Sequence, residues 1–304
     1  MEFPFANWMK TCAPIHERCI ADISLVGSHD CATAKILKKH IIPPFSIVPT
    51  KYRGFIKRWA KTQRLSIGDQ CKAGSRYFDF RVIYDTGLDD FFLLHGFYCI
   101  RLEDALKEIV QFLDEHADEV LIVDMNHIFN VKSKTVMKKL YNLIEGLCAK
   151  HAVLDDSDKI HAPLKSLVRL HQRMFVFCLN LPHVNLPKPL FVFDHAQVTS
   201  LWPNRNTTSR MMKVLSNNTR KAKDLTQPTI VQAIVTPSIS SIRKSFYDKE
   251  YPATTLMIAQ ETNPVVLNWL HSQHTFINIL LIDDIGKNDQ IVAEMIKRNT
   301  TFPR

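Results

Sequence analysis

The chain has 304 residues, of which 46% are hydrophobic, and it carries a net charge of +9. A chain of this size can bury a substantial core, and no apolar run reaches the roughly 18 residues that are needed to span a bilayer. No secretory leader is expected, and the seven cysteines, odd in number and without a Cys-x-x-Cys pair, favour reduced thiols in a cytoplasmic protein.

The first apolar run, residues 23–26, predicts a buried strand, and a short polar segment follows it directly. That segment reads Gly27-Ser28-His29-Asp30. A single histidine after a strand is more often a capping or hydrogen-bonding residue than a catalytic one. A catalytic role for His29 therefore requires a second titrating group at a matching position, because acid and base work needs two.

A strongly basic segment comes next, since the chain has no acidic residue between Cys31 and Gly68. Basic residues mixed with apolar and aromatic ones, here over residues 35–64, suit peripheral contact with an anionic membrane surface. The alternative is a solvated loop and a helix whose apolar face belongs to the core. Nucleic acid is not expected, because no nucleic-acid motif accompanies the charge. The basic residues are Lys35, Lys38, Lys39, Lys51, Arg53, Lys57, Arg58, Lys61 and Arg64, and the apolar ones are Ile36, Leu37, Ile41, Ile42, Phe45, Phe55, Ile56 and Trp59.

Two further apolar runs carry polar groups. The strand expected over residues 77–83 contains Asp79 and Arg81, whose side chains should point the same way because they lie two positions apart. Arg81 could be the ion-pair partner of an aspartate. A buried arginine at the mouth of a barrel also calls for an anion, and phosphate fits its planar fork. The run over residues 91–94 ends at His95.

The rest of the chain alternates between helical patterns and apolar runs. Residues 102–113 repeat apolar positions every three or four residues with acids in the first turn, which is typical of an amphipathic helix. The apolar run 120–123 precedes Asp124, Asn126 and His127, of which His127 is expected to have a structural or substrate-shaping role. Helical patterns also cover residues 136–147, 211–215, 264–270 and 291–296, and apolar runs cover residues 174–179, 230–235 and 277–282, the last followed by Asp283.

The apolar runs are nearly continuous rather than alternating, which favours strands that are covered on both faces, as in a parallel sheet. We therefore expect one α/β domain over residues 1–304, with a core of about 20–295, folded as a triosephosphate-isomerase-type barrel. About seven strands rather than eight can be counted, so the barrel could be incomplete or distorted. Reactive groups in such barrels lie at the carboxyl ends of the strands. The residues expected there are His29, Asp30, Arg81, His95 and Asp283.

This set of residues has the chemistry of a phosphodiester-cleaving site. Two histidines can serve as base and acid, and an arginine can neutralise a phosphate. A carboxylate can hold one histidine in its working tautomer. None of these roles requires a metal.

The motifs resemble the X domain of phosphatidylinositol-specific phospholipase C (PI-PLC), in particular the small stand-alone PI-PLC X-domain-containing proteins. A Gly-Ser-His-Asp box matches residues 27–30, a Gly-x-Arg-Tyr-x-Asp-x-Arg box matches residues 74–81, and a His-Gly box matches residues 95–96. The opening residues 5–9 and the closing Asn-Ile-x-x-x-Asp-x-Ile-Gly at residues 278–286 are also similar to the family. The resemblance covers nearly the whole chain and is weaker in its middle.

The resemblance implies a reaction and a role for each residue. His29 would be the base that takes the proton from the inositol 2-hydroxyl, which then attacks the neighbouring phosphorus. His95 would protonate the leaving diacylglycerol oxygen, and Arg81 would neutralise the phosphorane. Asp283 would orient His29, and Asp30 would assist His95. The products would be diacylglycerol and a cyclic inositol phosphate.

Arg81 also bears on the metal. In calcium-dependent enzymes of the family the corresponding position is an acid that binds the ion, so a fixed positive charge there implies no calcium and no other cofactor. Asp79, Asp124 and Asn126 are expected on the substrate-binding side. Asp284 stands where relatives carry an aromatic residue, which leaves the headgroup open.

Two alternatives remain at this point. A glycerophosphodiesterase also uses two histidines on a barrel, but it would need a Glu-x-Asp metal pair where this chain has Asp79-Phe80-Arg81. A phosphoinositide-binding, membrane-associated protein with little turnover would use the basic segment alone.

Overall fold

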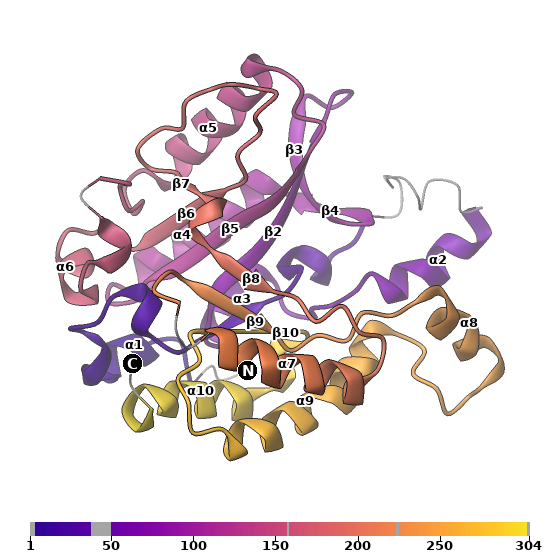
Figure 1. Cartoon of the computed structure of the whole chain (residues 1–304). Helices are drawn as coiled ribbons and strands as arrows, with labels where there is room; N and C mark the ends of the chain where they lie inside the picture. Colours follow the sequence, from indigo (N-terminus) through magenta and orange to yellow (C-terminus); the bar gives the residue numbers. More distant parts are fainter. Residues whose placement is uncertain (1–3, 38–49, 157, 223–224, 303–304) are drawn as a thin grey trace.

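The computed structural model describes residues 4–37, 50–156, 158–222 and 225–302, and its centre is one curled ten-stranded sheet (Figure 1). The strands are β1 (Leu25–Ser28), β2 (Ser75–Asp85), β3 (Asp90–His95), β4 (Phe97–Arg101), β5 (Leu121–Phe129), β6 (Met174–Cys178), β7 (Phe193–Asp194), β8 (Thr199–Leu201), β9 (Thr229–Gln232) and β10 (Ile279–Ile282).

Eight of these strands run parallel in the order β7-β6-β5-β2-β1-β10-β9-β8. The other two form a hairpin that extends from β2, because β3 pairs with β2 and β4 with β3, both antiparallel. Strands β7 and β8 stand at the two ends of this order, and the short 3-10 helix η6 (His195–Gln197) lies between them in sequence. The predicted α/β barrel is therefore confirmed, in an open form.

Helices cover the outside of the curl. Figure 1 shows α5 and α6 on one side of the sheet and α7, α9 and α10 on the other. In the ranges that the structure describes, no helix combines the length and the apolar character that crossing a bilayer requires. The helices are α1 (Trp8–Thr11), α2 (Thr50–Trp59), α3 (Ile67–Lys72), α4 (Leu102–Glu115), α5 (Lys134–Cys148), α6 (Leu164–Arg169), α7 (Thr208–Ala222), α8 (Ile239–Tyr247), α9 (Thr255–Ser272) and α10 (Asp289–Thr301).

The alternation of side chains along the strands produces both the interior core and the polar site. On β2, Tyr77 belongs to the buried cluster inside the curl, and Asp79 and Arg81 follow at the same spacing of two. On β10, Leu281 lies in the same cluster, and Asp283 follows it. Apolar side chains therefore fill the barrel near the start of the strands, and polar ones come at their carboxyl ends.

The structure corrects several sequence predictions. The apolar run 91–94 is not a strand of the parallel barrel, because it forms the antiparallel hairpin strand β3. Strands β4, β7 and β8 were not predicted, and β7 and β8 have only two and three residues, too few to give a pattern. The helix predicted over residues 264–270 is the second half of α9, which begins at Thr255 and contains Pro264 in its interior.

The basic segment also differs from the expectation. Ile36 and Trp59, expected among its exposed apolar residues, are both buried, because they pack into the core beside the sheet. Lys38, Lys39, Ile41, Ile42 and Phe45 lie outside the described residues.

Gly74 controls the entry of the chain into β2, the strand that carries Asp79 and Arg81. Its φ is +104°, and a Cβ there would lie 2.6 Å from the Cγ1 atom of Val292. We expect Gly74→Ala to lower the free energy of unfolding by about 2–4 kcal/mol, since both the backbone and the packing would be strained. Urea denaturation followed by circular dichroism measures the change.

Gly146 in α5 is the matched control, because a Cβ there would meet nothing within 4 Å. Gly146→Ala should raise the stability by about 0.5–1 kcal/mol, since alanine favours a helix interior. Equal stability of Gly74→Ala and the wild type would contradict the packing described for β2.

Candidate active site

A cavity of about 440 Å³ opens where the parallel strands end, and it collects side chains from distant parts of the sequence. Tyr77 and Leu281 form part of its apolar lining and connect it to the interior core. The histidine, arginine and aspartate side chains that line it are His29, Asp79, Arg81, His95, His127, His195 and Asp283.

The carboxylate of Asp30 lies at the centre of the charged groups, and its side chain is 0% exposed. Asp30 Oδ1 lies 2.7 Å from Arg81 Nε, while Oδ2 lies 3.1 Å from His29 Nε2 and 3.2 Å from His95 Nε2. Burial opposes ionisation of Asp30, but Arg81, His29 and His95 together lower its pKa. Asp30 is therefore an ionised carboxylate shared by three cationic or protonatable groups.

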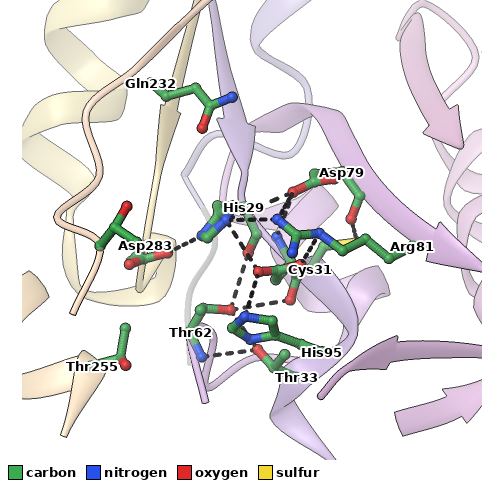
Figure 2. A network of polar contacts seen from close by, with 12 residues as sticks. His29, Cys31, Thr33, Thr62, Asp79, Arg81, His95, Gln232, Thr255 and Asp283 are labelled. Atoms are coloured by element: carbon green, nitrogen blue, oxygen red, sulfur yellow. Dashed lines mark hydrogen bonds and ion pairs between the residues drawn. The ribbon is translucent and has the colours of Figure 1, made fainter. Parts of the chain in front are cut away.

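His29 lies between the carboxylate of Asp283 on one side and those of Asp30 and Asp79 on the other; Figure 2 labels Asp283 and Asp79. Its Nδ1 donates a hydrogen bond of 2.7 Å to Asp283 Oδ1, so Nε2 is the nitrogen that titrates toward Asp30. Burial alone would lower the pKa of His29, but Asp30, Asp283 and Asp79 outweigh it and raise this pKa to about 9. At neutral pH His29 is thus an imidazolium in the free site.

His95 is fixed by a backbone group. Its Nδ1 donates to the carbonyl oxygen of Ala60 at 2.8 Å, and since a carbonyl only accepts, Nε2 is again the titrating atom. Burial, together with Arg81 and His29, lowers the pKa of His95 against the opposing effect of Asp30. The two rings have centroids 6.1 Å apart, so two titrating nitrogens with unequal proton affinity face one region of the cavity.

The guanidinium of Arg81 contacts three residues whose ligand atoms are close enough together to hold a cation. Ligand atoms of His29, Asp30 and Asp79 lie within 4.8 Å of one another, a spacing that could hold a cation. The guanidinium contacts all three, however, with Arg81 Nη2 3.3 Å from His29 Nε2 and 3.8 Å from Asp79 Oδ2 in addition to the Asp30 contact. Calcium prefers six to eight oxygen ligands. Two carboxylates already paired with an arginine do not fit it.

Residues 60–63, which follow α2, hold the segment after β1 that carries His29 and also hold the ring of His95. Thr62 Oγ1 lies 3.1 Å from the carbonyl oxygens of His29 and Asp30, as a donor to either. Gln63 Nε2 donates to the carbonyl oxygens of His29 and Ile282, at 3.2 and 3.1 Å. Residues 60–63 thereby fix His95 through Ala60 and the ends of β1 and β10 through Thr62 and Gln63.

The structure brings together His29, Asp30, Arg81, His95 and Asp283, which the sequence predicted as one site. All of them except the buried Asp30 line the cavity. Asp79 and Asn126 line it too, and Asn126 Nδ2 donates to Asp79 Oδ1 at 2.6 Å. Asp124 lies elsewhere: its side chain is 0% exposed, and it accepts hydrogen bonds from Tyr77 and His195 behind the cavity wall. Asp124 can therefore act on a ligand only through those neighbours.

Sequence reasoning missed several lining residues. His195 follows the two-residue strand β7 and the apolar run 190–193, which was not predicted as a strand. Gln232 ends β9, and Trp202 follows β8; neither belongs to a motif. The position of His195 after Phe191-Val192-Phe193-Asp194 was the one available signal.

Helices α2 and α8 form one rim of the cavity and lie on the same side of the molecule (Figure 1). Phe55 of α2 stacks on Phe246 of α8 with ring centroids 4.2 Å apart. Ile239 is 73% and Tyr247 is 88% exposed, and Trp202 near the cavity is also exposed. This rim therefore presents large apolar side chains to solvent.

Comparison with known proteins agrees with the sequence motifs, although no family model matches the chain. The chain is 23% identical to PI-PLC X domain-containing protein 3 of Mus musculus over 316 residues, which cover 99% of this chain and 95% of the relative. It is 25% identical to the variant-surface-glycoprotein phospholipase C of Trypanosoma cruzi over 296 residues, which cover 88% and 76%.

Among solved structures, the phosphatidylinositol-specific phospholipase C of Listeria monocytogenes aligns with a TM-score of 0.64 at 17% identity, covering 98% of this chain and 99% of that one. The resemblance to PI-PLC X-domain proteins and the barrel fold are thereby confirmed.

The effect of the Asp283 hydrogen bond on the pKa of His29 can be tested by titration. Asp283→Asn removes one of the negative charges that hold the proton on His29, so the pKa of His29 should fall from about 9. Nuclear magnetic resonance of labelled histidine measures it directly.

The same change should alter how stability depends on pH. In the wild type, folding raises the pKa of His29 from 6.5 to about 9, so this contribution to stability is present below pH 6.5 and is lost as the pH rises to about 9. Asp283→Asn should flatten that loss. An unchanged His29 titration in the variant would show that Asp283 does not set its protonation.

Proposed function

We propose that this chain, which is similar over nearly its full length to PI-PLC X domain-containing proteins, is a phosphodiesterase of the phospholipase C type. Its substrate would be phosphatidylinositol or a related phosphoinositide, and its products diacylglycerol and a cyclic inositol phosphate. The observation that supports this most strongly is the shared Asp30 carboxylate, with both imidazoles on one oxygen and Arg81 on the other.

His29 is the proposed general base. The proton that it must accept is that of the headgroup hydroxyl next to the phosphodiester, and the sugar ring already holds this oxygen near phosphorus. The new bond forms between that oxygen and phosphorus. Asp283 keeps Nδ1 protonated, so Nε2 is the only ring nitrogen that can accept the proton.

His95 is the proposed general acid, which gives its Nε2 proton to the leaving diacylglycerol oxygen as the bond from phosphorus to that oxygen breaks. At neutral pH the Nε2 atoms of His29 and His95 share one proton between them, and in the free site His29 holds it. An anionic phosphodiester favours the charged form of the nearby His95. Asp30 Oδ2 contacts both Nε2 atoms, so it offers the proton a short path from His29 to His95.

Arg81 is proposed to supply the positive charge that neutralises the phosphorane oxygens, without calcium. The guanidinium is preorganised by Asp30 and Asp79, which raise its pKa although burial opposes this. A fixed charge that is already in place at the reacting group needs no reorganisation during the reaction.

We further propose that the rim formed by α2 and α8 contacts the membrane. Exposed Ile239, Phe246 and Tyr247 can enter the apolar boundary of a bilayer, while Arg58 of α2 and Lys244 of α8 can approach anionic lipid. This assigns the contact to two helices, where the sequence suggested only the basic segment 35–64.

Catalysis is tested with phosphatidylinositol in mixed vesicles that contain excess EGTA. Wild-type protein should release cyclic inositol phosphate, and His29→Ala and His95→Ala should each lower the rate by about 10²–10⁴-fold, because each removes a proton-transfer group. Adding calcium should leave the wild-type rate within about twofold, since electrostatic stabilisation comes from Arg81.

His161→Ala serves as the control, because this histidine is 46% exposed and lies outside the cavity. It should retain the wild-type rate. Vesicle binding without product would favour the binding-module alternative, and a rate that chelation abolishes and calcium restores would contradict the role of Arg81.

The membrane contact is tested by sedimentation with vesicles of phosphatidylcholine and phosphatidylserine. Ile239→Ser combined with Tyr247→Ser should weaken binding by about tenfold or more, because apolar area is lost from the interface. Arg58→Gln should weaken it about fivefold, as expected for one charge near anionic lipid. Leu190→Ser, at a residue that is 62% exposed but lies outside both helices, should change nothing. Equal binding by all variants would reject this rim as the contact.

A further inference from the structure

Gln63 is fully buried, and both the nitrogen and the oxygen of its side-chain amide are bound to backbone groups. Nε2 donates to the carbonyl oxygens of His29 and Ile282, at 3.2 and 3.1 Å, and Oε1 accepts from the N–H of Ile285 at 3.0 Å. An amide nitrogen has two hydrogens, so one is available for each carbonyl. Breaking any of these contacts would leave a buried polar group unpaired, which fixes the position of the amide.

These contacts lie where the pairing of β1 with β10 ends. The register of the two strands ends at Ser28 and Ile282, and the N–H of His29 donates to the carbonyl oxygen of Ile282 at 3.1 Å. The 2.7 Å hydrogen bond between His29 and Asp283 comes one residue farther along each chain segment. Gln63 therefore connects the two segments at the point where the strand pairing stops.

The turn after β10, which carries Asp283, depends on contacts from outside the turn. Asp284 has a φ of +55°, in the left-handed region that residues other than glycine rarely adopt. Such a conformation persists where surrounding contacts determine it. The N–H of Asp284 donates to the carbonyl oxygen of Thr62 at 2.8 Å, and Asn263 Nδ2 donates to that of Asp283 at 3.0 Å. Gln63 adds a contact before this turn and one after it.

Gln63 is itself fixed by the segment that carries the proposed base. Thr33 lies in the short 3-10 helix η3 (Cys31–Ala34), which follows His29 directly in the chain. Its Oγ1 accepts hydrogen bonds of 3.0 Å from the backbone N–H groups of both Thr62 and Gln63, and Figure 2 shows Thr33 beside Thr62. The segment after β1 and residues 62–63 therefore hold each other in place.

We propose that Gln63 is a positioning residue of this site, which holds Asp283 at hydrogen-bond distance from His29. Gln63 is not among the residues that line the cavity, so it can act on a substrate only through those two. A carboxylate that moves away from Nδ1 stabilises the imidazolium less and no longer fixes the ring. The effect on the rate of cleavage rests on the proposed function, whereas the effect on the protonation of His29 does not.

The test compares two substitutions that remove the same kind of contact at opposite ends of the barrel. Gln63→Met keeps the approximate size of the side chain and removes the amide. Asn278→Leu is the matched control, because the buried Asn278 amide also donates to two backbone carbonyls and accepts from one N–H. Its partners are Ile20 and Ile23, which precede β1, and Thr229, which begins β9. A loss of stability alone would therefore affect both variants alike.

Gln63→Met should lower kcat for phosphatidylinositol about 10–100-fold and leave KM within about twofold, because a misplaced catalytic group affects the reaction more than binding. In the same variant the pKa of His29, measured by nuclear magnetic resonance of labelled histidine, should fall from about 9. Asn278→Leu should keep the wild-type values of kcat and of the His29 pKa. Circular dichroism verifies that both variants are folded at the temperature of the measurements.

An unchanged His29 pKa in Gln63→Met, or an equal fall of this pKa in Asn278→Leu, would overturn the positioning role. If Gln63→Met does not fold, hydrogen exchange of the wild-type protein decides the question. The N–H of Ile285, which Gln63 accepts, should exchange as slowly as those of β10, and rapid exchange by local opening would overturn the role as well.

The titration of His29 does not depend on turnover, so the two proposals can fail separately. A lowered His29 pKa in Gln63→Met without any cleavage by the wild type would reject only the catalysis. Cleavage by the wild type at a rate that Gln63→Met retains would reject only the positioning role.

Discussion

The whole site depends on one buried carboxylate. Asp30 has no exposed side-chain surface, and an isolated charge there would be strongly unfavourable. It remains ionised because Arg81 lies on one oxygen and two imidazoles lie on the other. Each partner is in turn fixed by something else: His29 by Asp283, His95 by a carbonyl, and Arg81 by Asp79. Removing any one of them changes the protonation of the others.

The alternation of side chains along the barrel strands makes this concentration of charge possible. Every second residue of β2 and β10 points inward, so the pattern that buries Tyr77 and Leu281 also carries Arg81 and Asp283 to the cavity. The charged groups, whose burial is energetically unfavourable, are thus held by strands that are anchored in the packed apolar core. Parallel pairing of β1 with both β2 and β10 then brings residues more than 250 positions apart in sequence into hydrogen-bond distance.

The sequence predicted the barrel and five residues of the candidate site because short polar motifs lie within or directly after several of its apolar runs. It did not predict a site residue that follows a very short strand, or a site group that belongs to the backbone. His195 follows a two-residue strand, and the group that orients His95 is the backbone of Ala60, which any residue could supply. Asp124 was predicted at the substrate, since its place after a strand is visible in sequence, whereas the side chain of His195 that covers it is not. The hairpin β3-β4 has the composition of a barrel strand, and only pairing distinguishes it.

The carbonyl of Ala60 has a wider consequence. It comes directly after α2, whose last carbonyl, that of Trp59, accepts a hydrogen bond of 2.6 Å from Thr255. The helix at the proposed lipid-facing rim and the backbone group that orients the proposed acid, His95, are therefore adjacent in the chain. In such an arrangement, a displacement of α2 at a membrane would act directly on the hydrogen bond that holds the His95 ring.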